Sequence, residues 1–521
     1  MKSQTAVARG ATSLYLANVA NLVANTLYFL ILTNLLRSTL DVGVITALNI
    51  TIWLLVTVCV LAQPVTLQSP IPAPLAVLKF LPELRARKGL ADAAKVFKAS
   101  VGTTGIIGAV IAGTLILIPN AVGSLIGGEA VQPDLVRLTG LDILVLSVGQ
   151  VAMGSLVALG DTKTASIYIV AWSIARYAAA SVLLVIFSLT GVLIGWMIGD
   201  AILLTLALWS CNRQIRSREE PTTFKLADLA KYSMYTVFSA LIGFAVNQAD
   251  KIFTLANQGL RELAIYNVAI VAATFTGFAP YALLTVLLPA FSALYSMKKE
   301  KEMRDMIRVY GRYVSIIVLP IAMGFAAITE VALRIFGQDY VAGFVPSAIV
   351  SVATGLTAIG VVYAAVLLAT GALGWYTTAN VIGLGALLTV SATFGGTLGL
   401  SAPALGRAAL MGVTVFTYTI AVRRQGFLYL DLKAFLVAAA SSTVMGLIIF
   451  FALSFAGSFL MKLALLVPLV ALGAGIYLGS LRMVRLLTSD DVQFVSEIAP
   501  ERVQQIILWV GKLLAVNPRE K

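Results

Sequence analysis

The chain has 521 residues, of which 59% are hydrophobic and 12% are charged, and its formal net charge is +13. Its mean hydropathy is +0.94. This composition excludes a soluble enzyme and is typical of a chain that is embedded in lipid.

Fourteen long apolar stretches follow one another along the chain. A membrane-spanning helix needs about 20 mostly apolar residues, so we predict an all-α polytopic membrane protein with about 14 transmembrane helices. The connections are short, which leaves no room for a separate catalytic domain. The predicted spans are 11–33, 43–63, 101–119, 140–160, 165–187, 191–210, 232–256, 265–296, 313–335, 345–370, 374–394, 399–421, 434–456 and 461–481.

An internal repeat appears when the chain is laid on itself at an offset of about 210 residues. Residues 156–160 (LVALG) match 367–371 (LLATG), and 124–128 (SLIGG) match 333–337 (LRIFG). We therefore expect two six-helix bundles around a central cavity. The predicted parts are a first bundle at 1–210, a second at 211–424, two additional transmembrane helices at 425–481 and a cytoplasmic amphipathic tail at 482–521.

The positions of lysine and arginine predict the orientation, because cytoplasmic loops retain positive charge. With the N-terminus inside, most of the 37 basic residues fall in inner segments. Examples precede the third, seventh and ninth spans, at 85–98, 213–218 and 298–308. We expect a multi-pass protein of the cell membrane with both termini in the cytoplasm. This rule and attraction to anionic headgroups explain the net charge, and nothing indicates nucleic-acid binding.

Several short motifs resemble one known family. Residues 247–251 (NQADK) end the seventh predicted span, and 264–269 (AIYNVA) begin the eighth. Other matches are 80–84 (FLPEL), 288–292 (LPAFS) and 336–340 (FGQDY). Together they resemble the polysaccharide exporters, or O-antigen-type flippases, of the multidrug/oligosaccharidyl-lipid/polysaccharide exporter superfamily. Ala264 departs from the glycine of that family's pattern, whereas Gly43 keeps it at the equivalent place in the first half.

This resemblance implies a transporter and not an enzyme. Its expected function is moving a polyprenyl-linked saccharide from the inner to the outer leaflet by alternating access. A multidrug or organic-cation antiporter of the same superfamily is the alternative. A membrane glycosyltransferase or polymerase ranks below both, because the longest outer loop, 120–139, holds only Glu129 and Asp134 as acidic residues.

Charged residues inside spans are costly and need partners or water. Arg176 and Asp200 lie at similar depth in the fifth and sixth spans. They form either a static pair or a site where Arg176 grips the phosphate of a lipid carrier. Arg407 in the twelfth span either faces the cavity or extends to the headgroups. Asp250 and Lys251 near the outer end of the seventh span are read mainly as partners of loop charges, with coupling as the alternative.

Polar amides are concentrated in the same spans. Asn18, Asn21 and Asn25 project from roughly one face of the first span. They either hydrogen-bond between helices or form one wall of a sugar-binding cavity, because hydroxyl-rich ligands need donors and acceptors. The cavity reading also draws on Asn49, Gln150, Asn247 and Gln248.

Catalytic and metal-binding residues are not predicted anywhere in the chain. Histidine is absent, and the two cysteines, Cys59 and Cys211, lie on separate spans. Without histidine, the chain lacks the commonest general base and the commonest metal ligand, and the two cysteines show no metal-binding spacing. No cofactor is expected, while coupling to an ion gradient and the oligomeric state stay open.

Overall fold

A computed structural model describes residues 2–36, 38–60, 76–87, 90–215, 226–484 and 486. Within these ranges the regular structure is helical and no strand occurs. The helices are α1 Lys2–Leu36, α2 Thr39–Val60, α3 Ala76–Arg87, α4 Leu90–Leu117, α5 Pro119–Gly127, α6 Pro133–Ala158, α7 Thr162–Gln214, α8 Leu226–Gln258, α9 Leu260–Ala273, α10 Phe278–Ser296, α11 Glu300–Phe336, α12 Phe344–Leu356, α13 Gly360–Ala369, α14 Leu373–Leu398, α15 Ser401–Arg424, α16 Leu432–Ser454 and α17 Phe459–Met483.

The prediction of an all-α polytopic membrane fold is confirmed. In the described residues, eleven helices are long and apolar enough to cross a membrane. Helix α7 has 53 residues and turns back on itself at Ser188, where φ is 54°. It therefore covers the predicted fifth and sixth spans. The eighth span is divided into α9 and α10, and the tenth into α12 and α13. Fourteen spans are compatible with this arrangement, but the number stays a prediction.

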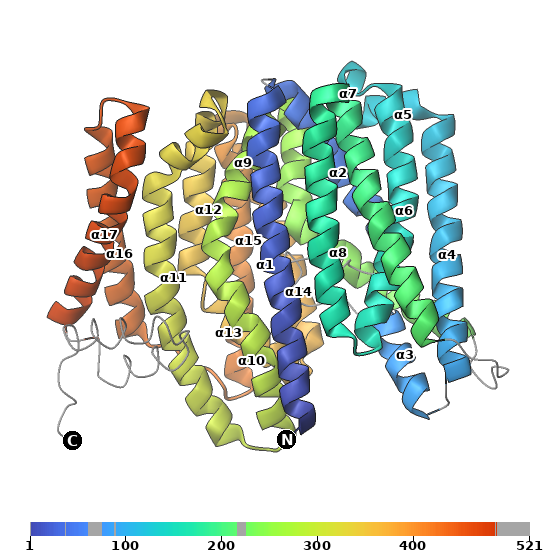
Figure 1. The fold of residues 1–521 in the computed structure, drawn as a ribbon. Coiled ribbons are helices and arrows are strands. Elements are labelled where there is room, and N and C mark those ends of the chain that lie inside the picture. Colours follow the sequence, from blue (N-terminus) through green and yellow to red (C-terminus); the bar gives the residue numbers. More distant parts are fainter. Residues whose placement is uncertain are drawn as a thin grey trace.

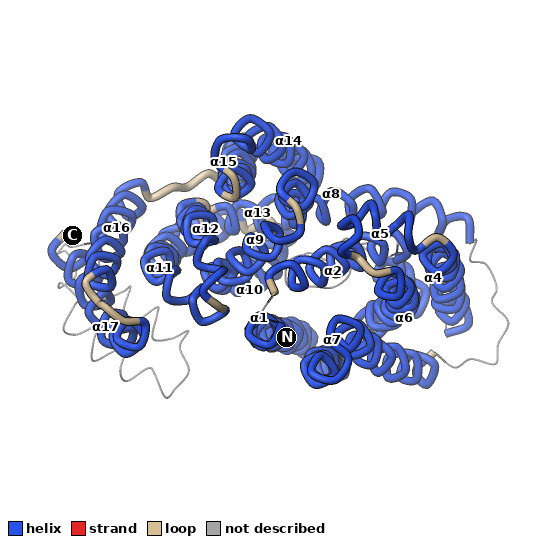
Figure 2. Tube along the Cα trace, turned by 90° about the horizontal axis from the view of Figure 1, so that it is seen from above, coloured by secondary structure: helices blue, strands red, loops and turns tan. Residues whose placement is uncertain are grey.

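The helices form two groups that meet along the middle of the molecule. Seen from above, α4, α5, α6 and α7 lie at one end and α11, α12 and α13 toward the other (Figure 2). Helices α1 and α2 meet α8, α9 and α10 between them. The pair α16 and α17 packs on α11 at the outer edge. The start of α1 and the end of α17 lie on the same side of the molecule (Figure 1).

The two groups touch closely on the side where α1 ends and α2 begins, at the top of Figure 1. A Cβ added to Gly43 of α2 would lie 2.0 Å from the carbonyl oxygen of Leu260, the first residue of α9. Asn34 of α1 donates a hydrogen bond of 3.1 Å to the carbonyl oxygen of Ile335 on α11. On the opposite side, the ring of Phe80 on α3 meets that of Tyr232 on α8 at 5.4 Å. Contacts therefore join the groups at both ends.

One predicted loop contains a helix, and two further segments lie largely outside the described residues. The predicted outer loop 120–139 contains helix α5, whose first residue is Pro119, a favourable position for proline. The predicted cytoplasmic helix in 482–521 falls almost wholly outside the described residues, as do the prolines between 64 and 74.

Candidate functional site

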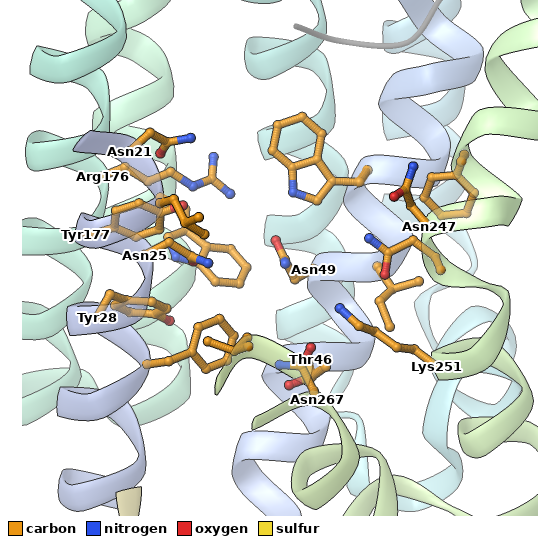
Figure 3. Close-up of a pocket in the computed structure, with 18 of the residues that line it drawn as sticks. Asn21, Asn25, Tyr28, Thr46, Asn49, Arg176, Tyr177, Asn247, Lys251 and Asn267 are labelled. Carbon is orange, nitrogen blue, oxygen red and sulfur yellow. The ribbon is translucent and has the colours of Figure 1, made fainter. Parts of the chain in front are cut away.

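A cavity of about 140 Å³ lies between the two groups of helices. Its wall comes from α1, α2 and α7 on one side and from α8 and α9 on the other (Figure 3). Amides, aromatic rings and two cations predominate. The polar and aromatic lining residues are Asn21, Asn25, Tyr28, Phe29, Thr46, Asn49, Trp53, Thr57, Arg176, Tyr177, Trp196, Phe244, Asn247, Gln248, Lys251 and Asn267.

Arg176 is both paired and part of the cavity wall. Its Nη1 donates to Asp200 Oδ2, and its side chain is 2% exposed, whereas that of Asp200 is fully buried. Trp172 Nε1 donates a hydrogen bond of 2.5 Å to the other oxygen of Asp200. The guanidinium also lies 4.9 Å from the ring centre of Trp196. The two readings of the sequence, a pair and a cavity-facing cation, therefore describe one arrangement.

A row of glycines lets this pair form. Gly191, Gly195 and Gly199 recur every four residues on the second arm of α7, so they share one helix face. Added Cβ atoms would lie 2.0 Å from the Leu183 carbonyl oxygen, 2.2 Å from the Ala180 nitrogen and 2.5 Å from the Arg176 Cα. Small residues at this spacing allow the backbones of membrane helices to approach closely. The close approach places Arg176 beside Asp200.

Asp142 of α6 is a third member of this cluster that the sequence analysis missed. Its Oδ2 lies 4.0 Å from Arg176 Nη2, and its carboxyl also lies against that of Asp200. Asp142 is fully buried, and neither of its oxygens accepts a hydrogen bond from the described residues. The predicted span 140–160 placed Asp142 at a helix end. Because α6 begins at Pro133, this carboxyl lies well inside the helix.

The second half holds a cluster of two cations and one carboxyl, Arg407, Lys251 and Asp250, whereas the first has one cation and two carboxyls. Arg407 of α15 donates through Nε to Asp250 Oδ2 at 2.7 Å and through Nη2 to the Asn247 carbonyl oxygen at 2.8 Å. Tyr266 of α9 donates to the same Asp250 oxygen at 2.8 Å. Asp250 is fully buried and Lys251 is 6% exposed. The favoured reading, in which Asp250 pairs with loop charges, is therefore wrong, because α8 continues to Gln258 and places Asp250 against α15.

The chain matches a known family over residues 91–343, described as "Polysaccharide biosynthesis protein". A comparison with curated protein sequences finds no match. The fold is similar to that of "Lipid II flippase MurJ, inward closed conformation", with a TM-score of 0.66 and 13% identity over 91% of this chain and 99% of that one. The chain has the fold of transporters of the multidrug/oligosaccharidyl-lipid/polysaccharide exporter superfamily, and the family match over 91–343 agrees with the resemblance seen in the sequence.

Drug-exporter structures of the superfamily are also similar. An inward-facing multidrug resistance MATE family transporter has a TM-score of 0.61 and 13% identity, over 87% of this chain and the whole of that one. A mutant of the Vibrio cholerae MATE transporter VcmN has a TM-score of 0.58 and 14% identity, over 82% and 99%. The predicted family resemblance is confirmed, and the chain has a transporter fold.

The superfamily fold brings most, but not all, of the predicted amides to the central cavity. Asn21, Asn25, Asn49, Asn247 and Gln248 line it. Asn18 is not among the lining residues, although it lies on α1 with Asn21 and Asn25. Gln150 is 4% exposed and also lies outside the lining. The sequence analysis did not name the aromatic members, Thr46, Thr57 or Asn267 as lining residues, although Asn267 stands in the motif 264–269.

Arg407 lies at a second cavity, about 260 Å³ in volume, inside the second half. Its wall comes from α9, α10, α12, α13 and α15 and is mostly apolar, with Ile270, Leu284 and Val350 as examples. Arg407 is not among the residues that line the central cavity. Arg407 therefore neither lines the central cavity nor extends freely to the headgroups, but pairs with Asp250 beside this second cavity.

Proposed function

We propose that the chain is a flippase that moves a lipid-linked oligosaccharide or polysaccharide precursor from the inner to the outer leaflet by alternating access. One observation carries this proposal. The cavity between the halves presents a guanidinium, Arg176, from one side and an ammonium, Lys251, from the other, with amides between them.

The chemistry of this wall matches a phosphate that bears a sugar. Guanidinium and ammonium groups form strong charge-assisted hydrogen bonds with phosphate oxygens. Amide side chains offer both donors and acceptors, as sugar hydroxyls require. Aromatic rings such as Trp53 and Tyr177 provide flat apolar faces beside them. A polyprenyl-linked saccharide combines these groups.

Transport requires the cavity to widen. A volume of about 140 Å³ is below the roughly 300–1,000 Å³ of sites for drug-sized ligands. Contacts join the halves at both ends, through Gly43 and Leu260 on one side and Phe80 and Tyr232 on the other. Alternate opening of these two contacts, with 1–210 and 211–424 rocking as two bundles, would expose the cavity to each leaflet in turn.

The distribution of basic residues supports an orientation of the chain in the membrane. The positive-inside rule assigns the lower side in Figure 1, where α1 begins and α17 ends, to the cytoplasm. Both termini of the chain would then be cytoplasmic. The substrate would enter from this side and leave on the side of α5.

A drug or organic-cation antiporter fits the cavity less well. A cationic substrate needs an accessible carboxylate, and none of the described residues that line the central cavity is Asp or Glu. Asp200 lies behind Arg176 and is fully buried. The two cations of the wall would repel such a substrate.

The proposal is tested with sealed vesicles that contain the purified protein and a polyprenyl-diphosphate-linked oligosaccharide. A lectin that cannot cross the membrane reports how much glycan reaches the opposite leaflet. We expect transfer by the natural chain and at least a tenfold loss in Lys251→Gln. Arg137→Gln, which changes an exposed outer residue, serves as the control. Equal transfer by both variants, or transport of an organic cation and of no lipid-linked saccharide, would contradict the proposal.

A further inference from the structure

Asp142 is a buried carboxyl that has only a long ion-pair contact, 4.0 Å to Nη2 of Arg176, among the described residues. Its neighbour Asp200 accepts hydrogen bonds from Arg176 and Trp172, whereas the oxygens of Asp142 accept none from the described residues. One guanidinium faces two carboxyls. A buried charge without a partner is very costly, and two adjacent carboxylates resist being ionised together.

Among the described residues, the surroundings of Asp142 supply no further compensating charge. The charged groups that face it are Arg176 and Asp200, both from α7. Helix α4 meets this part of α6 through Ala112 and Leu115, which pack around Gly140. Helix α2 brings the thiol of Cys59 near Ser147. Helices α3 and α5 pack against α6 near opposite ends of the molecule, α3 at the bottom and α5 at the top of Figure 1.

From this geometry we infer that Asp142 is a proton-binding site whose occupancy controls how tightly Arg176 binds the anionic substrate. The inference rests on the proposed function, because it assigns Arg176 to the phosphate. Arg176 is the shared element. It lines the cavity and lies beside both carboxyls.

With a proton on Asp142, the cluster of Arg176, Asp200 and Asp142 is neutral. Arg176 is then held by Asp200 alone and has donors left for a phosphate in the cavity. When water reaches the cluster and Asp142 loses its proton, the cluster carries one net negative charge. The carboxylate of Asp142 then attracts Nη2 of Arg176, which lies 4.0 Å from its Oδ2. The net negative charge of the cluster also repels the phosphate.

Proton binding and anion binding are therefore positively linked. By reciprocity, an anion that binds to Arg176 must favour the protonated form of Asp142 to the same degree. The proton comes from water and returns to water, and no bond of the substrate changes. A flippase with this linkage would carry a proton in the same direction as its anionic substrate.

The test measures the binding of farnesyl diphosphate, a short polyprenyl diphosphate, to the full chain in lipid nanodiscs between pH 5 and pH 8. Calorimetry in buffers of different ionisation enthalpy gives the protons taken up. Asp142→Asn imitates the protonated carboxyl, and Asp142→Leu does so without polar atoms. The ligand's own titration is common to all variants and cancels in the comparison.

We expect the affinity of the natural chain to fall with rising pH relative to Asp142→Asn, by up to tenfold per pH unit. The natural chain should take up as much as one proton more than either variant. Asp142→Glu should retain the linkage. Equal pH profiles and equal proton uptake in the natural chain, Asp142→Asn and Asp142→Leu would overturn the inference while leaving phosphate recognition intact. A failure of the natural chain to bind the probe at any pH would overturn both proposals.

Discussion

The two halves of the molecule each bury one arginine–aspartate pair, and they differ in the charge that accompanies it. In the first half, the pair of Arg176 and Asp200 is joined by a second carboxyl, Asp142. In the second half, the pair of Arg407 and Asp250 is joined by a second cation, Lys251. The surplus is acidic in one half and basic in the other.

This difference decides what the central cavity presents. The surplus acid of the first half is fully buried and separated from the cavity by Arg176, whereas the surplus cation of the second half points into it (Figure 3). The cavity is cationic although the six groups contain three cations and three carboxyls. An arrangement of this kind can bind an anion without leaving three cations uncompensated in the membrane.

The largest expected effect comes from removing the cation of the first half. In Arg176→Met, Asp200 and Asp142 lose their only guanidinium, and breaking a buried pair in this way costs about 3–5 kcal/mol. In Arg407→Met, Asp250 keeps the hydroxyl of Tyr266 and Lys251 nearby, so the loss should be smaller. Thermal unfolding in detergent compares the two variants. Equal losses would mean that the second cluster has no compensating groups.

The glycine face of α7 provides the next test. Gly195→Ala places a Cβ within 2.2 Å of the Ala180 nitrogen, so the two arms must separate and Arg176 moves away from Asp200. We expect about 1–3 kcal/mol of destabilisation, as for other overpacked sites. Gly412→Ala is the matched control, because nothing lies within 4 Å of its added Cβ, and it should gain about 0.5–1 kcal/mol of helix stability. Similar melting temperatures in the two variants would contradict the packing argument.

The sequence offered the first-half pair as one of two readings because the evidence for it was local. Arg176 and Asp200 stand in consecutive spans joined by a tight turn, so equal depth follows from counting residues. The matched repeat segments also had a local cause. Gly160 and Gly371 have positive φ angles of 85° and 73°, a conformation that glycine adopts readily.

The rest of the site depended on information that a single sequence does not contain. Arg407 and Asp250 are 157 residues apart, and nothing along the chain indicates that α8 and α15 touch. Asp142 was missed through an error at a helix boundary, since a charged residue next to a predicted span end looks like an ordinary terminal residue. The spacing of Gly191, Gly195 and Gly199 was present in the sequence and would have indicated the close packing.

Lys251→Gln tests the surplus cation of the second half without removing a buried pair. Asp250 keeps Arg407 and Tyr266, so the melting temperature should change little. Losing one charge-assisted bond to phosphate costs about 1.4 kcal/mol, which is tenfold in affinity. Binding of farnesyl diphosphate should weaken by that factor, and Lys251→Arg should restore most of it. Unchanged affinity in Lys251→Gln would mean that the ammonium does not reach the anion.

Arg407→Lys should have the smallest effect and separates the two arginines most sharply. A lysine keeps the charge next to Asp250, but it loses the planar set of donors that reaches both Asp250 and the Asn247 carbonyl oxygen. We expect a loss of about 1 kcal/mol in stability, one ordinary hydrogen bond, and no change in farnesyl diphosphate affinity, because Arg407 lines the second cavity and not the central one. Unfolding and binding measured on the same preparation distinguish these quantities. A weakened affinity at unchanged stability would place Arg407 among the substrate ligands and remove the asymmetry between the halves.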